Sequence, residues 1–193
     1  MCSSDLLVVL GADNQTININ TRSRDLTVTG LGTGDVTGAT LGQIKLAGTV
    51  NINTTAGFPE IDGIVRLLRD DDGGMGQIDK LAGTGDATLS ITAGLGSVIQ
   101  GNLGTIAPIQ THNIVSAGDT LLGDLFVAGN TINISILGDL EVTGVMDEEE
   151  GDINITTGGA VTLQSQTTAT GNISLTSGST VTTQAITSQA NMT

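Results

Sequence analysis

The chain has 193 residues, with 28 Gly, 2 Pro and 2 Phe, and it contains neither Trp nor Tyr. Compact domains draw much of their buried area from aromatic side chains, so this composition favours thin layers of small aliphatic residues, as in β-sheets, over a helical bundle. Six Lys and Arg against 20 Asp and Glu give a formal net charge of −14, which disfavours binding to nucleic acid or to anionic membranes.

The first ten residues predict no export or membrane segment. We interpret residues 1–6 as a non-native start, similar to a translated sequencing-adapter end, and we treat both ends of the sequence as cuts in a longer chain. The apolar run Leu6–Leu10 is too short for a spanning helix and follows no basic segment, so neither a transmembrane segment nor a signal peptide is predicted. Cys2 is the only cysteine, which excludes an intrachain disulfide and a cysteine-based zinc site.

In residues 7–57, apolar and polar residues alternate as they do in short strands. Ile17 and Ile19, for example, alternate with Asn18 and Asn20. An apolar residue at every second position is typical of a strand with one buried face. Because the spacing between such segments is uneven, we predict irregular coils of stacked strands in this region.

Residues 58–76 interrupt the alternation. This segment contains a proline and the run Ile64–Arg69, and we interpret it as a loop or a strand excursion from the body of the fold. Its acidic end, Asp70, Asp71 and Asp72 before two glycines, is the candidate metal site, because adjacent carboxylates in a flexible turn can wrap calcium. The spacing matches neither an EF-hand loop nor a Gly-Gly-x-Gly-x-Asp repeat, so a plain acidic turn is the other interpretation. Apart from calcium, no cofactor is predicted.

Residues 77–193 contain an internal repeat that is most regular from residue 131. Ile153 follows Ile132 by 21 residues (153 − 132), and Ile173 follows Ile153 by 20 (173 − 153). A unit of about 20 residues cannot bury its apolar face alone and must stack on copies of itself. The sequence therefore predicts an all-β parallel β-helix, or β-solenoid, whose coils each hold two short strands and a return segment. The predicted columns are Ile132, Ile153 and Ile173 facing inward and Asn133, Asn154 and Ser174 facing outward.

The remaining polar residues form no pattern that dictates a reaction. His112, the only histidine, lies beside a strand start without a Cys, Ser or Asp arrangement, and we predict a surface turn residue. The run Asp147–Glu150 lies at a turn between two repeats and predicts a solvated corner, with weak cation binding as the alternative. The six Lys and Arg share no repeated column with an acidic pair, so we predict that the chain is not an enzyme.

The repeat units Gly151–Leu163 and Gly171–Ser179 resemble those of filamentous-haemagglutinin-like exoproteins and of large autotransporter passengers of Gram-negative bacteria. The resemblance implies a right-handed β-helical shaft that is secreted or projects from the bacterial outer membrane and continues into further repeats of the same chain. It implies adhesion to glycans or proteins of a host or neighbouring cell. A shaft of this kind works by being long and stiff, and its binding region can lie in another part of the protein.

Two other functions stay open at this point. Parallel β-helices also carry polysaccharide lyases and depolymerases, and a groove that collects Asp or Glu with Lys or Arg on one face would favour such a carbohydrate-active protein. A calcium-stabilised extracellular repeat is the third interpretation. Folding that depends on a divalent cation would favour it.

Overall fold

The computed structural model describes residues 7–10, 16–20, 26–29, 43–54, 65–68, 77–93, 96–115 and 118–193. Within these residues all regular secondary structure is β, and 21 strands form one 14-stranded and one 7-stranded sheet. In chain order the strands are β1 Leu7–Leu10, β2 Thr16–Asn20, β3 Leu26–Thr29, β4 Gln43–Leu46, β5 Thr49–Asn53, β6 Val65–Leu68, β7 Gln77–Lys80, β8 Thr88–Thr92, β9 Val98–Gln100, β10 Asn102–Leu103, β11 Ile109–Val115, β12 Thr120–Leu122, β13 Leu125–Ile136, β14 Leu140–Val142, β15 Met146–Glu148, β16 Asp152–Thr157, β17 Val161–Leu163, β18 Thr167–Ala169, β19 Ile173–Ser177, β20 Val181–Thr183 and β21 Ile186–Ser188.

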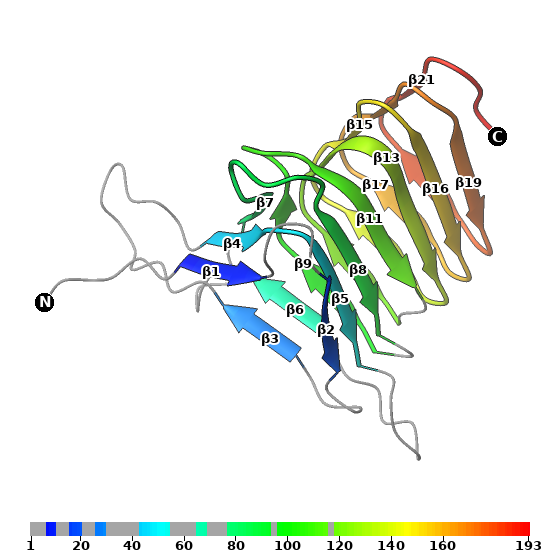
Figure 1. Cartoon of the computed structure of the whole chain (residues 1–193). Coiled ribbons are helices and arrows are strands. Elements are labelled where there is room, and N and C mark those ends of the chain that lie inside the picture. The colour runs from blue at the N-terminus through cyan, green and yellow to red at the C-terminus, as the bar shows by residue number, and fades with distance from the viewer. Residues whose placement is uncertain are drawn as a thin grey trace, which may run out of the picture.

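The strands stack coil on coil along one axis, with β1 to β3 at one end and β19 and β21 at the other (Figure 1). Neighbouring strands pair in parallel, and Ile132 pairs directly with Ile153, so one coil takes 21 residues at this point. The predicted fold, an all-β parallel β-solenoid with coils of about 20 residues, is confirmed.

Each regular coil has three walls. After β16 and β17 the chain forms β18, and β19 then begins the next coil directly above β16. The predicted return segment therefore contains a third strand, because β15, β18 and β21 pair in register with one another. Strands such as Thr167–Ala169 are three residues long and carry little apolar alternation, so their pattern did not predict a strand.

The predicted columns are confirmed. Ile132, Ile153 and Ile173 pair in one column and are at most 1% exposed. Asn133, Asn154 and Ser174 pair in the adjacent column and are half-buried. Because strands in a sheet lie about 4.8 Å apart, each column repeats one kind of side chain at that interval along the solenoid.

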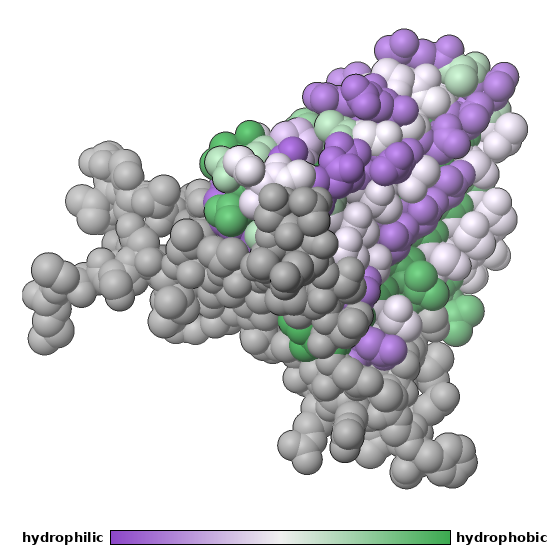
Figure 2. All heavy atoms as spheres, in the orientation of Figure 1, coloured by the Kyte–Doolittle hydropathy of each residue, from purple (hydrophilic) through white to green (hydrophobic). Residues whose placement is uncertain are grey.

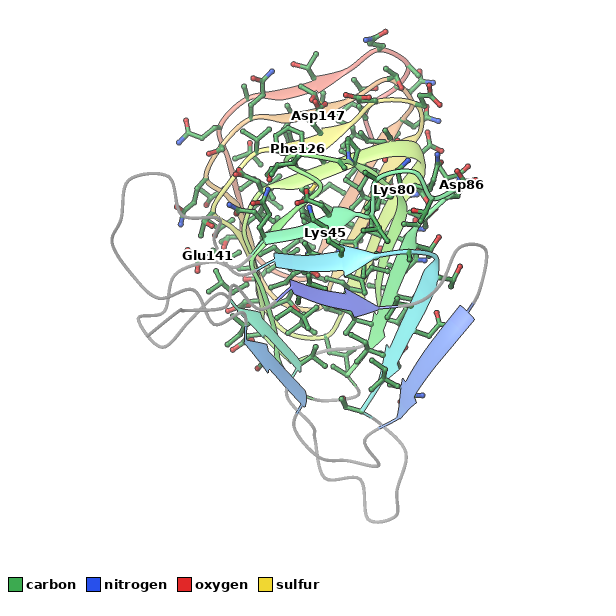
Figure 3. The ribbon with its side chains drawn as sticks, turned by 60° about the vertical axis from the view of Figure 1, so that its left-hand side comes forward. Lys45, Lys80, Asp86, Phe126, Glu141 and Asp147 are labelled. Atoms are coloured by element: carbon green, nitrogen blue, oxygen red, sulfur yellow. The ribbon has the colours of Figure 1, made fainter. Side chains whose placement is uncertain are left out.

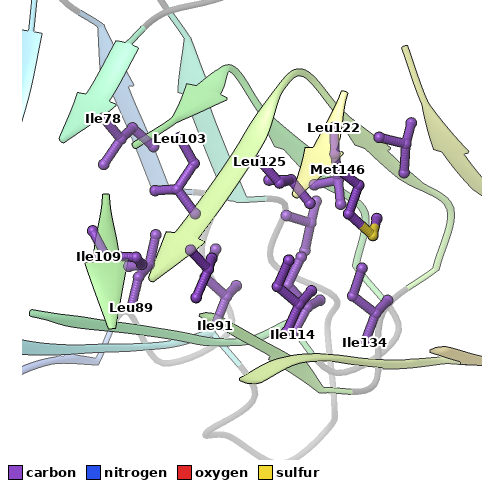
Figure 4. Packing of buried hydrophobic residues seen from close by; sticks show 14 of the residues in the cluster. Ile78, Leu89, Ile91, Leu103, Ile109, Ile114, Leu122, Leu125, Ile134 and Met146 are labelled. Carbon is purple, nitrogen blue, oxygen red and sulfur yellow. The ribbon is translucent and has the colours of Figure 1, made fainter. Parts of the chain in front are cut away.

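One apolar cluster fills the interior from Ile44 to Ile173. Figure 4 shows Leu89, Ile91 and Ile114 packing across the interior from residues of the opposite walls. Phe126 is half-buried on an outward position beside Asp147, and the buried apolar side chains of the described residues are Ile, Leu, Val, Ala and Met. A layer of Ile, Leu and Val at every coil provides hydrophobic stabilisation without large side chains.

Part of the predicted excursion over 58–76 belongs to the wall of the solenoid. Val65–Leu68 forms β6, which pairs with β3 and β9 in the seven-stranded sheet. Val65 and Leu67 are at most 2% exposed, because residues two apart in a strand point to the same side. The other residues of that segment, and residues 1–6, lie outside the described residues.

Asp and Asn side chains join successive coils at the corners. In each case a side-chain oxygen accepts a hydrogen bond from a backbone N–H about one coil later in the chain, which satisfies donors where the chain turns. The bonds run from Asp124 N to Asn102 Oδ1 (3.0 Å), from Asp139 N to Asp119 Oδ1 (3.1 Å), from Val145 N to Asp124 Oδ1 (2.7 Å), from Ala160 N to Asp139 Oδ1 (2.7 Å) and from Asn172 N to Asp152 Oδ1 (2.6 Å).

Close stacking at the corners predicts that Gly151→Ala destabilises the fold by about 2 kcal/mol, since a Cβ at this position collides with the backbone carbonyl of Asn130 in the coil below. Gly83→Ala is the matched control: Gly83 has φ +81° with open space around it, so only backbone strain of about 1 kcal/mol is expected. Urea unfolding measures both values. A smaller loss for Gly151→Ala than for Gly83→Ala would contradict the close approach.

Candidate functional site

A polar face runs along the outside of β8, β11, β13, β16 and β19, and we call it the ladder face. Figure 2 shows it as purple and white stripes along the solenoid axis. Its residues form three columns two positions apart, and register places each directly above the last. The columns are Thr88, Thr111, Thr131 and Asp152; Ser90, Asn113, Asn133, Asn154 and Ser174; and Thr92, Val115, Ser135, Thr156 and Thr176.

The middle column is a hydrogen-bonded amide ladder. Asn154 Nδ2 donates to Asn133 Oδ1 at 3.0 Å, and Asn133 Nδ2 donates to Asn113 Oδ1 at 2.9 Å. Asn113 Nδ2 donates to Ser90 Oγ at 3.2 Å. Stacked amides that satisfy one another make half-buried Asn stable on a strand.

Two grooves on the outer surface are also candidate sites. The first, of about 310 Å³, lies on the outside of the seven-stranded sheet. Its carboxylates are partly engaged: Asp119 and Asp139 each accept a hydrogen bond from a backbone N–H of the next coil, and Glu141 Oε1 accepts one from Gln164 Nε2 at 2.5 Å. Among the described side chains, no Lys or Arg lines this groove. The lining residues are Ser97, Ile99, Asp119, Thr120, Leu121, Asp139 and Glu141.

The second groove, of about 270 Å³, contains part of the acidic run Asp147–Glu150. Glu149 and Glu150 are exposed, as a solvated corner requires, and Asp147 accepts a hydrogen bond from Thr168 Oγ1. The lining residues that the structure describes are Asp147, Glu148, Glu149, Thr168, Ala169, Thr170, Thr187 and Gln189, with no Lys or Arg among them.

Glu148 departs from the predicted solvated corner. It pairs with Val127 and Ala169 in an inward column and is 1% exposed. Burial raises the pKa of Glu148 above its usual value, and the N–H groups of Glu150 (3.2 Å) and Gly129 (3.4 Å), which donate to Oε1, act in the opposite direction. The alternation of β15 places this carboxyl inside while its neighbours stay outside.

Sequence reasoning missed a buried ion pair between β4 and β7. Lys45 is labelled in Figure 3. Its Nζ lies 2.9 Å from Oδ2 of Asp79, and Asp79 is fully buried. Asp79 Oδ1 also accepts hydrogen bonds from the backbone N–H groups of Ile106 (3.0 Å) and Ala107 (3.3 Å). Asp79 therefore anchors the loop after β10. The two residues are 34 positions apart in an irregular coil, so no fixed period aligned them.

Asp79→Asn should cost about 2 kcal/mol, because the amide oxygen still accepts from the loop but Lys45 loses its charged partner in a mostly buried site. Asp86→Asn is the control, because this substitution removes the same charge at an exposed position. Urea unfolding at low and high salt separates the two variants. Equal losses would mean that the buried pair contributes nothing beyond net charge.

His112 is not the predicted surface turn residue. It lies in β11, fully buried, in the inward column between Leu89 and Ile132. Its Nδ1 lies 3.3 Å from the Leu89 carbonyl oxygen, and its Nε2 has no hydrogen-bond partner in the described part of the chain. Burial lowers the pKa of His112 from 6.5 to about 4, and the bond to Leu89 offsets this slightly. A buried neutral imidazole of this kind does not exchange protons with a surface ligand.

An available signal would have placed His112 correctly. Thr111, Asn113 and Ile114 align with Thr131, Asn133 and Ile134 at a spacing of 20, which puts His112 in the position of Ile132. The repeat register, rather than the chemistry of the residue, decides its side of the strand.

The described residues assemble no group of three or more His, Cys, Asp or Glu side chains that could hold a metal ion. The candidate calcium ligands Asp70, Asp71 and Asp72 lie outside those residues, so a site there stays a prediction. Among the same described ranges, no helix is long and apolar enough to cross a membrane. No protein-family model matches the chain, and neither a curated protein nor a solved structure matches it.

Proposed function

We propose that the chain is a structural and adhesive shaft segment of a larger secreted or cell-surface protein, and that it carries no catalytic site. The observation that supports this most directly is the unbroken stacking of coils on one apolar core from Ile44 to Ile173. In such a solenoid each coil contacts only its neighbours, so the length of the shaft grows with every added repeat. Further repeats of the same chain would extend the shaft at either end.

The outer surface supports adhesion rather than chemistry. The ladder face offers hydroxyl and amide groups at regular intervals, which suits hydrogen bonding to glycans or proteins on another cell. Lyase-type chemistry calls for carboxylates beside Lys or Arg in one groove. The described side chains that line the two grooves are carboxylates, hydroxyls, aliphatic groups and the amide of Gln189.

Beads coated with the chain test the proposal under flow over cultured cells and over extracellular matrix. Retention well above that of beads coated with the heat-denatured chain is expected, because adhesion needs the folded face. Equal retention of both would remove the adhesive role. Release of reducing ends from a panel of polysaccharides would replace the proposal with a carbohydrate-active enzyme.

A calcium-stabilised repeat makes a different prediction. We expect the melting temperature to stay unchanged between excess calcium and excess chelator, since the structural coils are held by their core and ladders. A rise in melting temperature with calcium would favour cation binding, with Asp70, Asp71 and Asp72 as the first residues to replace by Asn.

A further inference from the structure

The ladder face is nearly free of charge in a strongly acidic chain. Its three columns contain Thr, Ser, Asn, one Val and, where the first column reaches β16, one Asp, whereas the whole chain has a formal net charge of −14. Asp152 lies at its edge, next above Thr131, and its Oδ1 already accepts a hydrogen bond from Asn172 N. A cationic or anionic ligand would therefore find little charge here to recognise.

One column of this face presents free hydroxyl groups. Ser135, Thr156 and Thr176 stack directly above one another and are exposed. Their hydroxyls make no hydrogen bond to the described residues, so each retains a donor and two acceptor sites for a ligand. The β-branched threonines also place a methyl group beside each hydroxyl, which can pack against the C–H face of a sugar ring.

In the amide ladder beside this column, every hydrogen bond between coils runs in the same direction, from a donor in the later coil to an acceptor in the earlier one. Asn154 gives one N–H to Asn133, and Asn133 gives its two donors to Asn113 and to Thr131 Oγ1 (2.9 Å). Each Asn oxygen that accepts one bond in the ladder keeps a second lone pair. The face therefore combines a row of free hydroxyls with a row of amide oxygens, and both repeat at about 4.8 Å along the axis.

We propose that the ladder face, centred on Ser135, Thr156 and Thr176, binds a neutral polysaccharide chain that lies along the solenoid axis. A neutral glycan offers hydroxyls at a short, regular interval on a chain without charge, and it can form the same contacts at successive coils. Many weak and identical contacts sum to useful affinity through multivalency. This inference names the ligand class of the proposed adhesive function and rests on it.

Affinity electrophoresis tests binding in native gels that contain either soluble hydroxyethyl cellulose, which is neutral, or alginate, which is anionic. We expect retardation by the neutral polymer. The double variant Thr156→Glu with Thr176→Glu should lose at least tenfold in affinity, since it puts two carboxylates on the free hydroxyl column. The matched control, Thr162→Glu with Thr182→Glu, places the same charge on the outward column of β17 and β20 and should bind as the wild type does.

In the gel assay, three results would overturn the inference: no retardation by the neutral polymer, retardation by alginate alone, or equal loss in both double variants. Circular dichroism of each variant shows whether it is folded. Beads on cells treated with periodate, which destroys vicinal diols of glycans, separate this inference from the broader function. Unchanged retention on treated cells overturns glycan binding and leaves adhesion standing, whereas no retention on any surface removes adhesion itself.

Discussion

Replacing Ile153 by Asp should cost at least about 4 kcal/mol and unfold the coils on either side of it at neutral pH. The side chain is fully buried between Ile132 and Ile173 in the inward column. An aspartate there loses the apolar contacts of Ile and puts an unpaired carboxyl into the core. Because coils are stabilised by their neighbours, the loss spreads beyond the substituted coil. Thermal and urea unfolding followed by circular dichroism measure it.

Asn154→Asp is the matched control one residue away. Asn154 faces outward, is half-buried, and donates one hydrogen bond to Asn133 Oδ1. The change removes that donor and costs about 1 kcal/mol. Similar losses in the two variants, or a wild-type melting temperature for Ile153→Asp, would contradict the register that separates the two columns.

Acid should destabilise the chain through His112, and His112→Leu should remove this sensitivity. The unfolded chain takes up a proton on this imidazole below pH 6.5, whereas the folded chain resists protonation down to about pH 4. Between these values the unfolded state binds more protons, so folding stability falls as the pH falls. At about 1.4 kcal/mol for each pKa unit, the full loss reaches about 3 kcal/mol below pH 4.

Urea unfolding from pH 7.5 to pH 3.5 provides the measurement, as the difference between wild type and His112→Leu. Leucine resembles the neighbouring Leu89 and Ile132 and leaves no buried Nε2 without a partner, so this variant should be at least as stable as wild type at pH 7. Glu148, whose pKa is raised in the folded state, contributes in the opposite direction as the pH falls, and both chains retain it. A pH-independent difference would show that His112 titrates normally in the folded chain.

The regular coils could be predicted because similar residues recur at equivalent positions of successive repeats. Ile132, Ile153 and Ile173 alternate with polar neighbours at a nearly constant interval, and register follows once stacking is assumed. The third wall was missed, because a strand of three residues such as Thr167–Ala169 has too few positions to show alternation. Val65–Leu68 was interpreted as part of a loop or a strand excursion, because the segment around it contains a proline and interrupts the alternation.

The polar interior was harder to predict than the apolar one. Asp79, Glu148 and His112 are charged or titratable residue types, which are usually found at the surface, yet each occupies a buried position. Lys45 and backbone N–H groups compensate Asp79, but those partners come from other coils. Free hydroxyls on the ladder face could be anticipated from the outward columns, whereas the direction of the amide bonds between coils needed the geometry.

The corner bonds make the two ends of the solenoid chemically different. In each of them the accepting oxygen belongs to the earlier coil and the donating N–H to the later one, as between Asp119 and Asp139 and again between Asp139 and Ala160. A folded coil therefore presents ready acceptors to the segment that follows it in the chain. A coil added at the carboxyl-terminal end therefore brings backbone N–H donors to acceptors already in place, whereas a coil added at the amino-terminal end brings side-chain acceptors to backbone donors already in place.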